Sequence, residues 1–221
     1  MTSAEEAVAT DSLVEGAGAL GLELGRAQVD LLLRYARLLG EWGRVFNLSA
    51  IRDPAAVVSH HLLDSLAVVP RLVRWSGERC LRVLDAGSGA GLPGIPLAIA
   101  RPDWSITTID AVAKKAAFVR QAAGELGLTN LRALHGRVEA SLLDEAAGFD
   151  VIISRAFSSL ELFVRCTRAR LGPTGIWLAM KGKVPEAEIS ALPADLEVFH
   201  VEQFTVPGLA AARCLVWIRT H

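Results

Sequence analysis

The spacing of apolar residues changes near residue 80, and before that point it is helical. The apolar positions of the first stretch, between residues 26 and 45, are Val29, Leu32, Leu33, Ala36 and Leu39. Intervals of three and four residues are the period of one helical face. Farther on, Asp53-Pro54 has the form of an N-cap followed by a first-turn proline, and an apolar face continues from Val57 up to Pro70. The pattern predicts two amphipathic helices.

After residue 80 short apolar runs alternate with helical ones. In chain order these segments are 81–86, 94–100, 105–110, 114–126, 130–136, 149–157, 160–171 and 175–180. Such an alternation is typical of parallel βαβ units with right-handed crossovers. Segments 197–206 and 212–220 are typical of two closing strands joined at the Pro207-Gly208 turn. A hairpin that ends a parallel sheet fits a seven-stranded methyltransferase arrangement better than a repeating dinucleotide-binding fold.

The length and composition of the chain predict a folded protein. Its 221 residues are enough for one α/β domain with an extension, and two full domains would be a tight fit. Hydrophobic residues make up 52% and charged residues 21%, which is far from the composition of disordered chains. We place the boundary at the change of rhythm, with an N-terminal helical extension over residues 1–79 packed on a sheet domain over 80–221.

Charge, cysteines and hydropathy narrow the possible classes. The formal net charge of −1 gives no global attraction for a polyanion, so any affinity for RNA must come from local clusters of basic residues. The three cysteines are scattered outside any CxxC spacing, which predicts neither a disulfide framework nor a zinc site. No uninterrupted apolar run reaches about 18 residues and the first residues are acidic, so we expect a cytoplasmic protein with no membrane span.

A glycine-rich loop follows the first predicted strand and carries the strongest local signal. The loop contains Gly87, Gly89, Gly91 and Gly94 directly after the strand that ends in Asp85-Ala86. Glycines at the carboxyl end of a first strand let the backbone turn sharply and approach a ligand closely. The alternative is a tight turn that binds no ligand. Four closely spaced glycines would then cost conformational entropy on folding for no gain in binding.

The same glycines formally satisfy GxGxxG, which raises the alternative of a nicotinamide dinucleotide. The carboxylate of Asp85 would face a pyrophosphate unfavourably, whereas it suits the cationic amino and sulfonium groups of S-adenosylmethionine. The formal match also begins late relative to the strand end, and Pro93 falls where the helix should open. These features favour the methyl donor.

Asp110 ends the second predicted strand, at about the expected 20 residues beyond the loop. A carboxylate there can accept hydrogen bonds from the two ribose hydroxyls, and it would do so for either cofactor. The other interpretation makes Asp110 the N-cap of the helix that carries Lys114 and Lys115, which is compatible with binding.

Seven segments of the chain together resemble the ribosomal RNA small-subunit methyltransferase G family, also called glucose-inhibited division protein B. They are Asn47–Ser49, His61–Leu66, Asp85–Leu97, Lys114-Lys115, Gly136–Glu139, Ser154–Phe157 and Met180–Gly182. The resemblance covers nearly the whole chain. Two positions depart from it, because family members often have Thr where Ser49 stands and Arg or Lys where His60 stands.

The resemblance implies a Rossmann-like, seven-stranded, α/β S-adenosylmethionine-dependent methyltransferase that modifies N7 of one guanine in 16S ribosomal RNA. It implies the RNA or the small ribosomal subunit as partner and S-adenosylmethionine as cofactor. We expect no metal, because the residues themselves show no metal-ligand spacing. The expected cofactor-binding residues are Asp85, Gly87, Gly89, Leu92, Asp110, Val138, Glu139 and Arg155, with Val138 and Glu139 at the adenine. The expected RNA-contacting residues are Asn47, His61, Phe157 and Lys181. We expect a monomer.

Arg155 is the expected positioning residue of the reaction, because it follows the fourth strand where that strand opens onto the cleft. Ser154 and Phe157 could supply a hydrogen bond and a stacking face for a base, although Phe157 could equally be core. Lys181 and Lys183 could contact phosphates or could be solvated loop lysines. For Lys114 and Lys115 we favour a solvated helix face.

The sequence His60-His61-x-x-Asp64 allows a metal or acid–base site, since His60 and Asp64 are four residues apart on a helix. We favour a core histidine at His61, because no HExxH or Cys/His pairing accompanies it. Three other functions stay open: a small-molecule methyltransferase of the same fold, a dinucleotide-dependent oxidoreductase, and a non-catalytic ribosome assembly factor.

Overall fold

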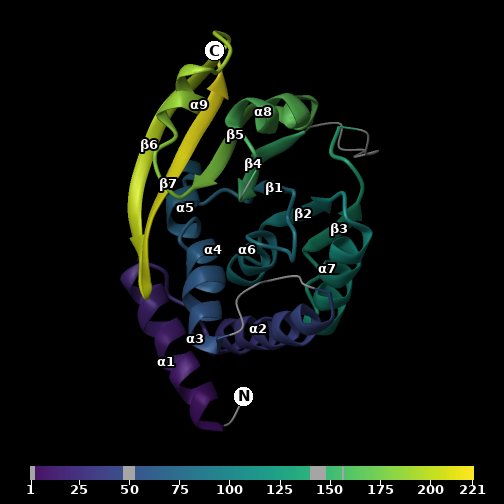
Figure 1. The fold of residues 1–221 in the computed structure, drawn as a ribbon, viewed down its shortest axis with the longest axis vertical. Helices are drawn as coiled ribbons and strands as arrows, with labels where there is room; N and C mark the ends of the chain where they lie inside the picture. Colours follow the sequence, from purple (N-terminus) through teal and green to yellow (C-terminus); the bar gives the residue numbers. More distant parts are fainter. Residues whose placement is uncertain (1–2, 47–52, 140–147, 156) are drawn as a thin grey trace.

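The computed structural model describes residues 3–46, 53–139, 148–155 and 157–221. Within these ranges one sheet has seven strands in the order β3-β2-β1-β4-β5-β7-β6 (Figure 1). The strands are β1 (Arg82–Ala86), β2 (Ser105–Asp110), β3 (Leu131–His135), β4 (Phe149–Arg155), β5 (Leu171–Lys181), β6 (Leu196–Val206) and β7 (Leu209–Thr220). β1 to β5 are parallel, and β7 pairs antiparallel with both β5 and β6. The predicted parallel sheet with a closing hairpin is confirmed.

Helices cover both faces of the sheet. Helices α6 (Gly94–Ala100) and α7 (Ala113–Leu126) both pack on β2 and β3. Helix α8 (Leu160–Thr167) packs on β5, and α9 (Glu186–Ser190) packs on α8. Adjacent residues of β1 contribute to different apolar clusters, because their side chains point to opposite faces of the sheet. Val83 belongs to the larger cluster and Leu84 to the smaller one. The central strands β1 and β4 are buried on both faces over most of their length, which is why their sequences show no regular alternation of apolar and polar residues.

The helices ahead of the sheet share the larger apolar cluster with it. They are α1 (Ser3–Ala19), α2 (Arg26–Phe46), α3 (Pro54–Val57), the π-helical turn η1 (Val58–Leu63), α4 (Asp64–Leu66) and α5 (Val69–Ser76). Leu32 of α2 and Leu62 of η1 are fully buried in the same cluster as Phe118 of α7. Helix α2 packs directly on α6 and α7, and the Trp42 and Phe118 rings lie 5.4 Å apart.

Several element boundaries differ from the prediction, and the differences around Pro70 and between residues 160 and 175 are the clearest. Pro70 does not end a helix but lies in the first turn of α5, where the missing N–H costs nothing. The helix predicted over 160–171 ends at Thr167, followed by the 3-10 turn η2 (Arg168–Arg170), and β5 starts at Leu171 rather than at 175.

Helix α1 lies within the predicted helical extension, but the apolar pattern did not predict it as a separate element. Its buried face consists mainly of the small residues Ala9 and Ala17 around Leu13, while Val8 and Val14 are exposed, so the apolar period is weak. The helix lies beside the turn of the β6–β7 hairpin (Figure 1), where residues of α1, η1 and the turn line one cavity.

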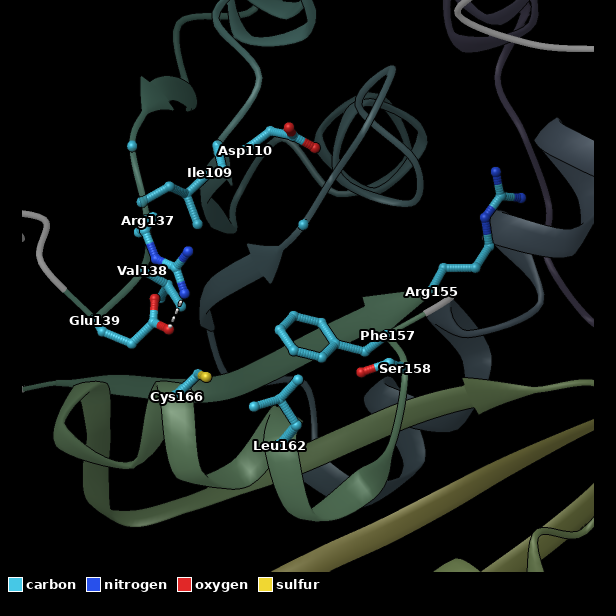
Figure 2. Close-up of a pocket in the computed structure, with 13 residues that line it drawn as sticks. Ile109, Asp110, Arg137, Val138, Glu139, Arg155, Phe157, Ser158, Leu162 and Cys166 are labelled. Atoms are coloured by element: carbon cyan, nitrogen blue, oxygen red, sulfur yellow. Dashed lines mark hydrogen bonds and ion pairs between the residues drawn. The ribbon is translucent and has the colours of Figure 1, made fainter.

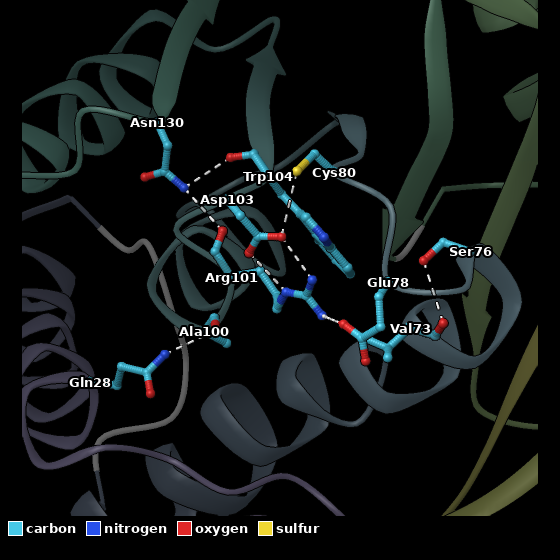
Figure 3. Close-up of polar contacts among 10 residues, drawn as sticks. All are labelled: Gln28, Val73, Ser76, Glu78, Cys80, Ala100, Arg101, Asp103, Trp104 and Asn130. Atoms are coloured by element: carbon cyan, nitrogen blue, oxygen red, sulfur yellow. Dashed lines mark hydrogen bonds and ion pairs between the residues drawn. The ribbon is translucent and has the colours of Figure 1, made fainter.

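Polar side chains hold the carboxyl end of α6 (Figure 3). The amide of Asn130 donates to the carbonyls of Ala98, Arg101 and Trp104 at 3.0–3.2 Å, and the amide of Gln28 donates to those of Ile99 and Ala100. The last carbonyls of a helix have no partner within it, so these amides supply what the helix lacks. The opposite end of α6 begins at Gly94, in the glycine loop.

One helical stretch, Ala55–Ser76, is long and apolar enough to cross a membrane by length and composition. However, 72% of its most apolar window is buried inside the protein. In this fold the stretch is a core helix.

Candidate functional site

A cavity of about 380 Å³ lies at the carboxyl ends of β1, β2 and β4 (Figure 2). Its lining residues are Gly87, Ile109, Asp110, Ala111, Gly136, Arg137, Val138, Glu139, Arg155, Phe157, Ser158, Leu162 and Cys166. This is the edge of an open parallel sheet at which such folds bind their ligands. Five of the eight expected cofactor-binding residues line the cavity, namely Gly87, Asp110, Val138, Glu139 and Arg155.

The glycine loop forms one wall of this cavity, and its glycines are needed for two different reasons. Gly87, Gly89 and Gly91 have φ values of +71°, +59° and +88°, which side-chain-bearing residues rarely adopt. Gly94 has no such angle, but a Cβ there would lie only 2.9 Å from Oδ2 of Asp85. Among the loop glycines only Gly87 lines the cavity, so it is the one at which a side chain would project toward a ligand.

Asp85 lies beneath the loop and does not line the cavity. Its Oδ2 accepts a hydrogen bond from the backbone N–H of Gly94 at 2.8 Å, and its Oδ1 is buried without a hydrogen-bond partner among the described residues. Burial raises the pKa of this carboxyl from 3.8 to about 7, against the opposing effects of the Gly94 N–H and Arg155. Asp85 thus fixes the start of α6, and its unsatisfied oxygen fits a nearby cationic group.

Asp110 connects the loop to the second strand. Its Oδ2 accepts from the N–H of Gly89 at 2.9 Å and its Oδ1 from that of Val112 at 2.8 Å. Helix α7 has Val112 as its N-cap, so the interpretation of Asp110 as the N-cap residue is wrong by two positions. A carboxylate has about four acceptor sites, and Asp110 therefore retains capacity for ribose hydroxyls from the cavity side.

The far end of the cavity has apolar walls and one acidic edge. Ile109, Val138 and Leu162 line it, and Glu139 pairs with Arg137 at 3.3 Å. Hydrogen bonds from its own backbone N–H and then from the Cys166 thiol lower the pKa of Glu139. An apolar slot with a carboxylate at its rim is suited to a purine ring with an exocyclic amine.

Phe157 forms the middle of the cavity wall. Its ring packs against Phe163 with centroids 5.4 Å apart, and a Cβ on Gly87 would lie 3.6 Å from it. Figure 2 shows the ring between Arg155 and the Val138 end of the cavity. Ser154, by contrast, is buried and donates to the carbonyl of Ala86 at 2.9 Å, so its hydroxyl holds β4 to β1 and does not face a base.

Arg155 separates the first cavity from a second one. This second cavity, of about 450 Å³, is lined by His60, His61, Asp64, Arg155, Met180, Lys181, Gly182 and Arg213. Nη1 of Arg155 donates to the carbonyl of His60 at 3.1 Å and to Oδ2 of Asp64 at 3.3 Å. Oδ1 of Asp64 accepts from Nε of Arg213 at 2.7 Å. Two guanidinium groups therefore share one carboxylate, of which only 3% is exposed.

The expected RNA-contacting residues do not all come together. His61 and Lys181 line the second cavity, whereas Phe157 lines the first, and Asn47 falls outside the described residues. Burial, and then the charge of Arg155, lowers the pKa of His61 from 6.5 to about 4, so its imidazole is neutral at pH 7. Lys181 is no solvated loop lysine, because its Nζ pairs with both carboxylate oxygens of Glu188 at 2.9 and 3.0 Å.

Two other expectations do not match the structure. Leu92 is 4% exposed and does not line the cavity, because its side chain packs into the larger apolar cluster. His60 does not meet Asp64: its Nδ1 lies 3.0 Å from Oγ of Ser59 and 3.1 Å from the carbonyl of Ala56. The π-helical turn of η1 changes the register on which the four-residue spacing depended.

Arg213 and Glu188 were missed as functional candidates. Arg213 lies on β7, 149 residues from Asp64 along the chain, and only the closing hairpin brings the two together. No local motif could have signalled this pairing. Over the described ranges, no group of three or more His, Cys, Asp or Glu side chains is arranged to hold a metal ion.

The strand order and the glycine loop place the chain in the fold class of the S-adenosylmethionine-dependent methyltransferases. A solved SAM-dependent methyltransferase from Aquifex aeolicus has this fold, with a TM-score of 0.53, 18% sequence identity and coverage of 75% of this chain and 93% of that one. Within the class, residues 28–216 match the family described as rRNA small subunit methyltransferase G, and the chain belongs to that family.

Relatives named ribosomal RNA small subunit methyltransferase G are similar over almost their full length. The protein of Acidovorax sp. strain JS42 is 53% identical over 216 residues, which cover 94% of this chain and 94% of the relative. The protein of Leptothrix cholodnii is 54% identical over 209 residues, covering 95% of this chain and 94% of the relative. The family resemblance found in the sequence is confirmed.

Proposed function

We propose that this protein transfers the methyl group of S-adenosylmethionine to N7 of a guanine in 16S ribosomal RNA. The observation that carries the proposal is the pair of cavities that meet at Arg155, one of which has the features of a nucleoside site and the other a cluster of cations. The family to which the chain belongs is named for small-subunit rRNA as its substrate. The choice of guanine N7 rests on the family resemblance.

The residues of the first cavity fit the cofactor. The carboxylate of Asp110 would take the ribose hydroxyls, and Val138 and Glu139 would hold the adenine. Gly87 would let the methionine part approach the backbone of the loop. Asp85, which lies behind the loop, would act on the cationic groups through its charge and through its hold on Gly94. S-adenosylmethionine supplies a methyl group bonded to a sulfonium.

For this reaction the protein mainly has to position the two reactants. Guanine N7 carries a lone pair and no proton, so its attack on a methyl carbon needs no general base. His61, which lines the second cavity, is consistent with that, because burial lowers its pKa to about 4 and makes it a weak base. Holding the two reactants in line accounts for several kcal/mol of such a reaction, on the order of 7–11 kcal/mol at best.

Arg155 is the proposed positioning residue. Its guanidinium is fixed by the His60 carbonyl and by Asp64, at the border of the two cavities. A planar group held in this way can orient a base without exchanging a proton with it, since arginine stays charged. We further propose that the protein acts as a monomer in the cytoplasm, on RNA or on the assembled small subunit.

The direct test is to incubate the protein with methyl-labelled S-adenosylmethionine and small ribosomal subunits from cells that lack this enzyme. The RNA is then digested and the labelled nucleoside identified. Label in N7-methylguanosine is the expected result. Label in another nucleoside would overturn the target atom, and transfer to free metabolites but not to RNA would select a small-molecule methyltransferase.

A further inference from the structure

The proposed reaction assigns no ligand to the second cavity, although this cavity shares Arg155 with the proposed cofactor site. Three cationic side chains line it, and each comes from a different strand: Arg155 from β4, Lys181 from β5 and Arg213 from β7. Their side chains are 23%, 15% and 21% exposed, so each is largely enclosed by protein yet open to the cavity on one side. A pocket with three half-enclosed cations is suited to an anion.

Two carboxylates contact these three cations, so the group carries one excess positive charge. Asp64 is shared by Arg155 and Arg213, and Glu188 neutralises Lys181. Three cations and two carboxylates sum to +1, whereas the whole chain has a formal charge of −1. The imidazole of His61 is neutral at pH 7 and does not alter this local excess.

The two guanidinium groups still have donors to offer. The described contacts of Arg155 use only its Nη1, and those of Arg213 use Nε and Nη1. A guanidinium has five N–H donors, and it binds phosphate oxygens in pairs. Asp64 forms an ion pair with each guanidinium group, so the orientation of both groups is set before a ligand binds.

We propose that the second cavity binds a backbone phosphate of the RNA strand, next to the nucleotide that is methylated. The inference rests on the proposed function, because it takes RNA as the substrate. A phosphodiester carries a single negative charge, which equals the local excess. Since Arg155 also lines the first cavity, a phosphate held there would lead the adjoining nucleotide toward Phe157 and the methyl donor (Figure 2). Contacts of this kind position RNA without reading its sequence.

The test is Arg213→Gln, with Arg219→Gln as the matched control. Both arginines lie on β7 and pair with a carboxylate, and they are six positions apart, which is about 20 Å along a strand. Dissociation constants for small ribosomal subunits are measured from about 50 to 200 mM salt, a range over which phosphate contacts are weakened strongly. We expect Arg213→Gln to weaken binding about tenfold at low salt and to reduce the log–log salt slope by about 0.7–0.9, the value of one phosphate contact.

Arg219→Gln should change neither quantity, and Arg213→Lys should keep the slope while losing part of the affinity. Calorimetry with S-adenosylmethionine shows whether each variant is folded, since its cofactor affinity should equal that of the wild type. Equal RNA binding by the two glutamine variants would overturn the phosphate site, as would loss of cofactor affinity in both Arg213 variants.

The proposed reaction can fail separately from this site. RNA binding that depends on Arg213, but without methyl transfer by the wild type, would overturn the reaction and retain the phosphate site. Methyl transfer to guanine N7 that both glutamine variants perform with equal subunit affinity would retain the reaction and overturn the phosphate site.

Discussion

At the scale of single residues, the glycine loop combines conformational need with access to the cavity. Gly87 is the position where the two meet, because its φ is +71° and it lines the cavity opposite Phe157. Gly127 has nearly the same angle, +69°, but a Cβ there would meet nothing within 4 Å. A side chain at either glycine would strain the backbone, but only one at Gly87 would also obstruct the cavity. Comparing the two positions therefore distinguishes the effect of strain from the effect of obstruction.

Replacing Gly87 by Arg should abolish binding of S-adenosylmethionine, because the side chain would project into the cavity and add a positive charge opposite a cationic ligand. Gly127→Arg, which carries similar backbone strain of roughly 1–3 kcal/mol, should bind the cofactor like the wild type. Calorimetry on both variants distinguishes the cases. Retained affinity in Gly87→Arg would contradict the proposed pocket.

We expect Asp85 to make cofactor binding dependent on pH. Its pKa is about 7 in the folded protein, against 3.8 as the ordinary value. Because the folded pKa is raised, the contribution of this group to stability is fully present below pH 3.8 and is lost as the pH rises through about 7. A cation bound nearby favours the ionised form, so cofactor binding should expel the proton.

The affinity for S-adenosylmethionine should accordingly increase between pH 6 and pH 8, by up to about tenfold per unit on the acid side of the pKa. Calorimetry in two buffers of different ionisation enthalpy should detect the released proton. Asp85→Asn should bind more weakly and lose the pH dependence. A wild-type affinity that is constant over this range would show that Asp85 does not sense the ligand.

At the scale of elements, helix α6 is the part that links the site to the scaffold. Its first residue, Gly94, donates to Asp85, and its last carbonyls accept from Asn130 and Gln28. Tyr35 of α2 adds a third tie, because its buried hydroxyl donates to the carbonyl of Ala90 in the glycine loop at 2.7 Å. The loop is thus held by residues that are far away in the sequence.

Asn130→Ala should lower the free energy of unfolding by about 1–3 kcal/mol, because it leaves carbonyls at the end of α6 without their donor. The control is Gln121→Ala, which removes an exposed amide whose partner is Glu125 on the same helix. That change should stay within about 0.5 kcal/mol. Urea unfolding measures both, and equal effects would mean that the Asn130 contacts contribute nothing special.

At the scale of the whole molecule, the helices before residue 80 and the sheet behave as one core. Tyr35 and Trp42 of α2 contact the ring of Phe118 on α7, and Leu62 and Leu66 are fully buried. The apolar cluster that contains Leu62 and Leu66 also contains Val83 and Ile106 from the sheet. Removing the extension would expose this face of the molecule to water.

We therefore expect the isolated segment 80–221 to lack a cooperative unfolding transition, although it holds every strand. The loss of burial is the reason, at roughly 25 cal/mol per Å² of apolar surface. Circular dichroism during heating, together with binding of a hydrophobic dye, tests the expectation. A sharp transition in the segment would show that the extension is a separate unit.

The sequence by itself determined the fold class, the glycine loop and the family. Strands buried on both faces, a helical period on either side of them and glycines at fixed spacing are local properties, so the chain displays them without tertiary contacts. The first cavity was largely predictable for the same reason, since Gly87, Asp110, Val138 and Arg155 each lie at the carboxyl end of a strand or just beyond it. Helix α1 escaped because alanines give too weak an apolar period.

Only the tertiary structure decided which side chains meet. Asp64 serves two arginines rather than a histidine, and one of these arginines comes from the last strand. Asp85 and Leu92 are buried and do not line the cavity. Contacts between residues 91 and 149 positions apart depend on strand order and on the register of a π-helical turn, and neither of these is encoded in any local pattern.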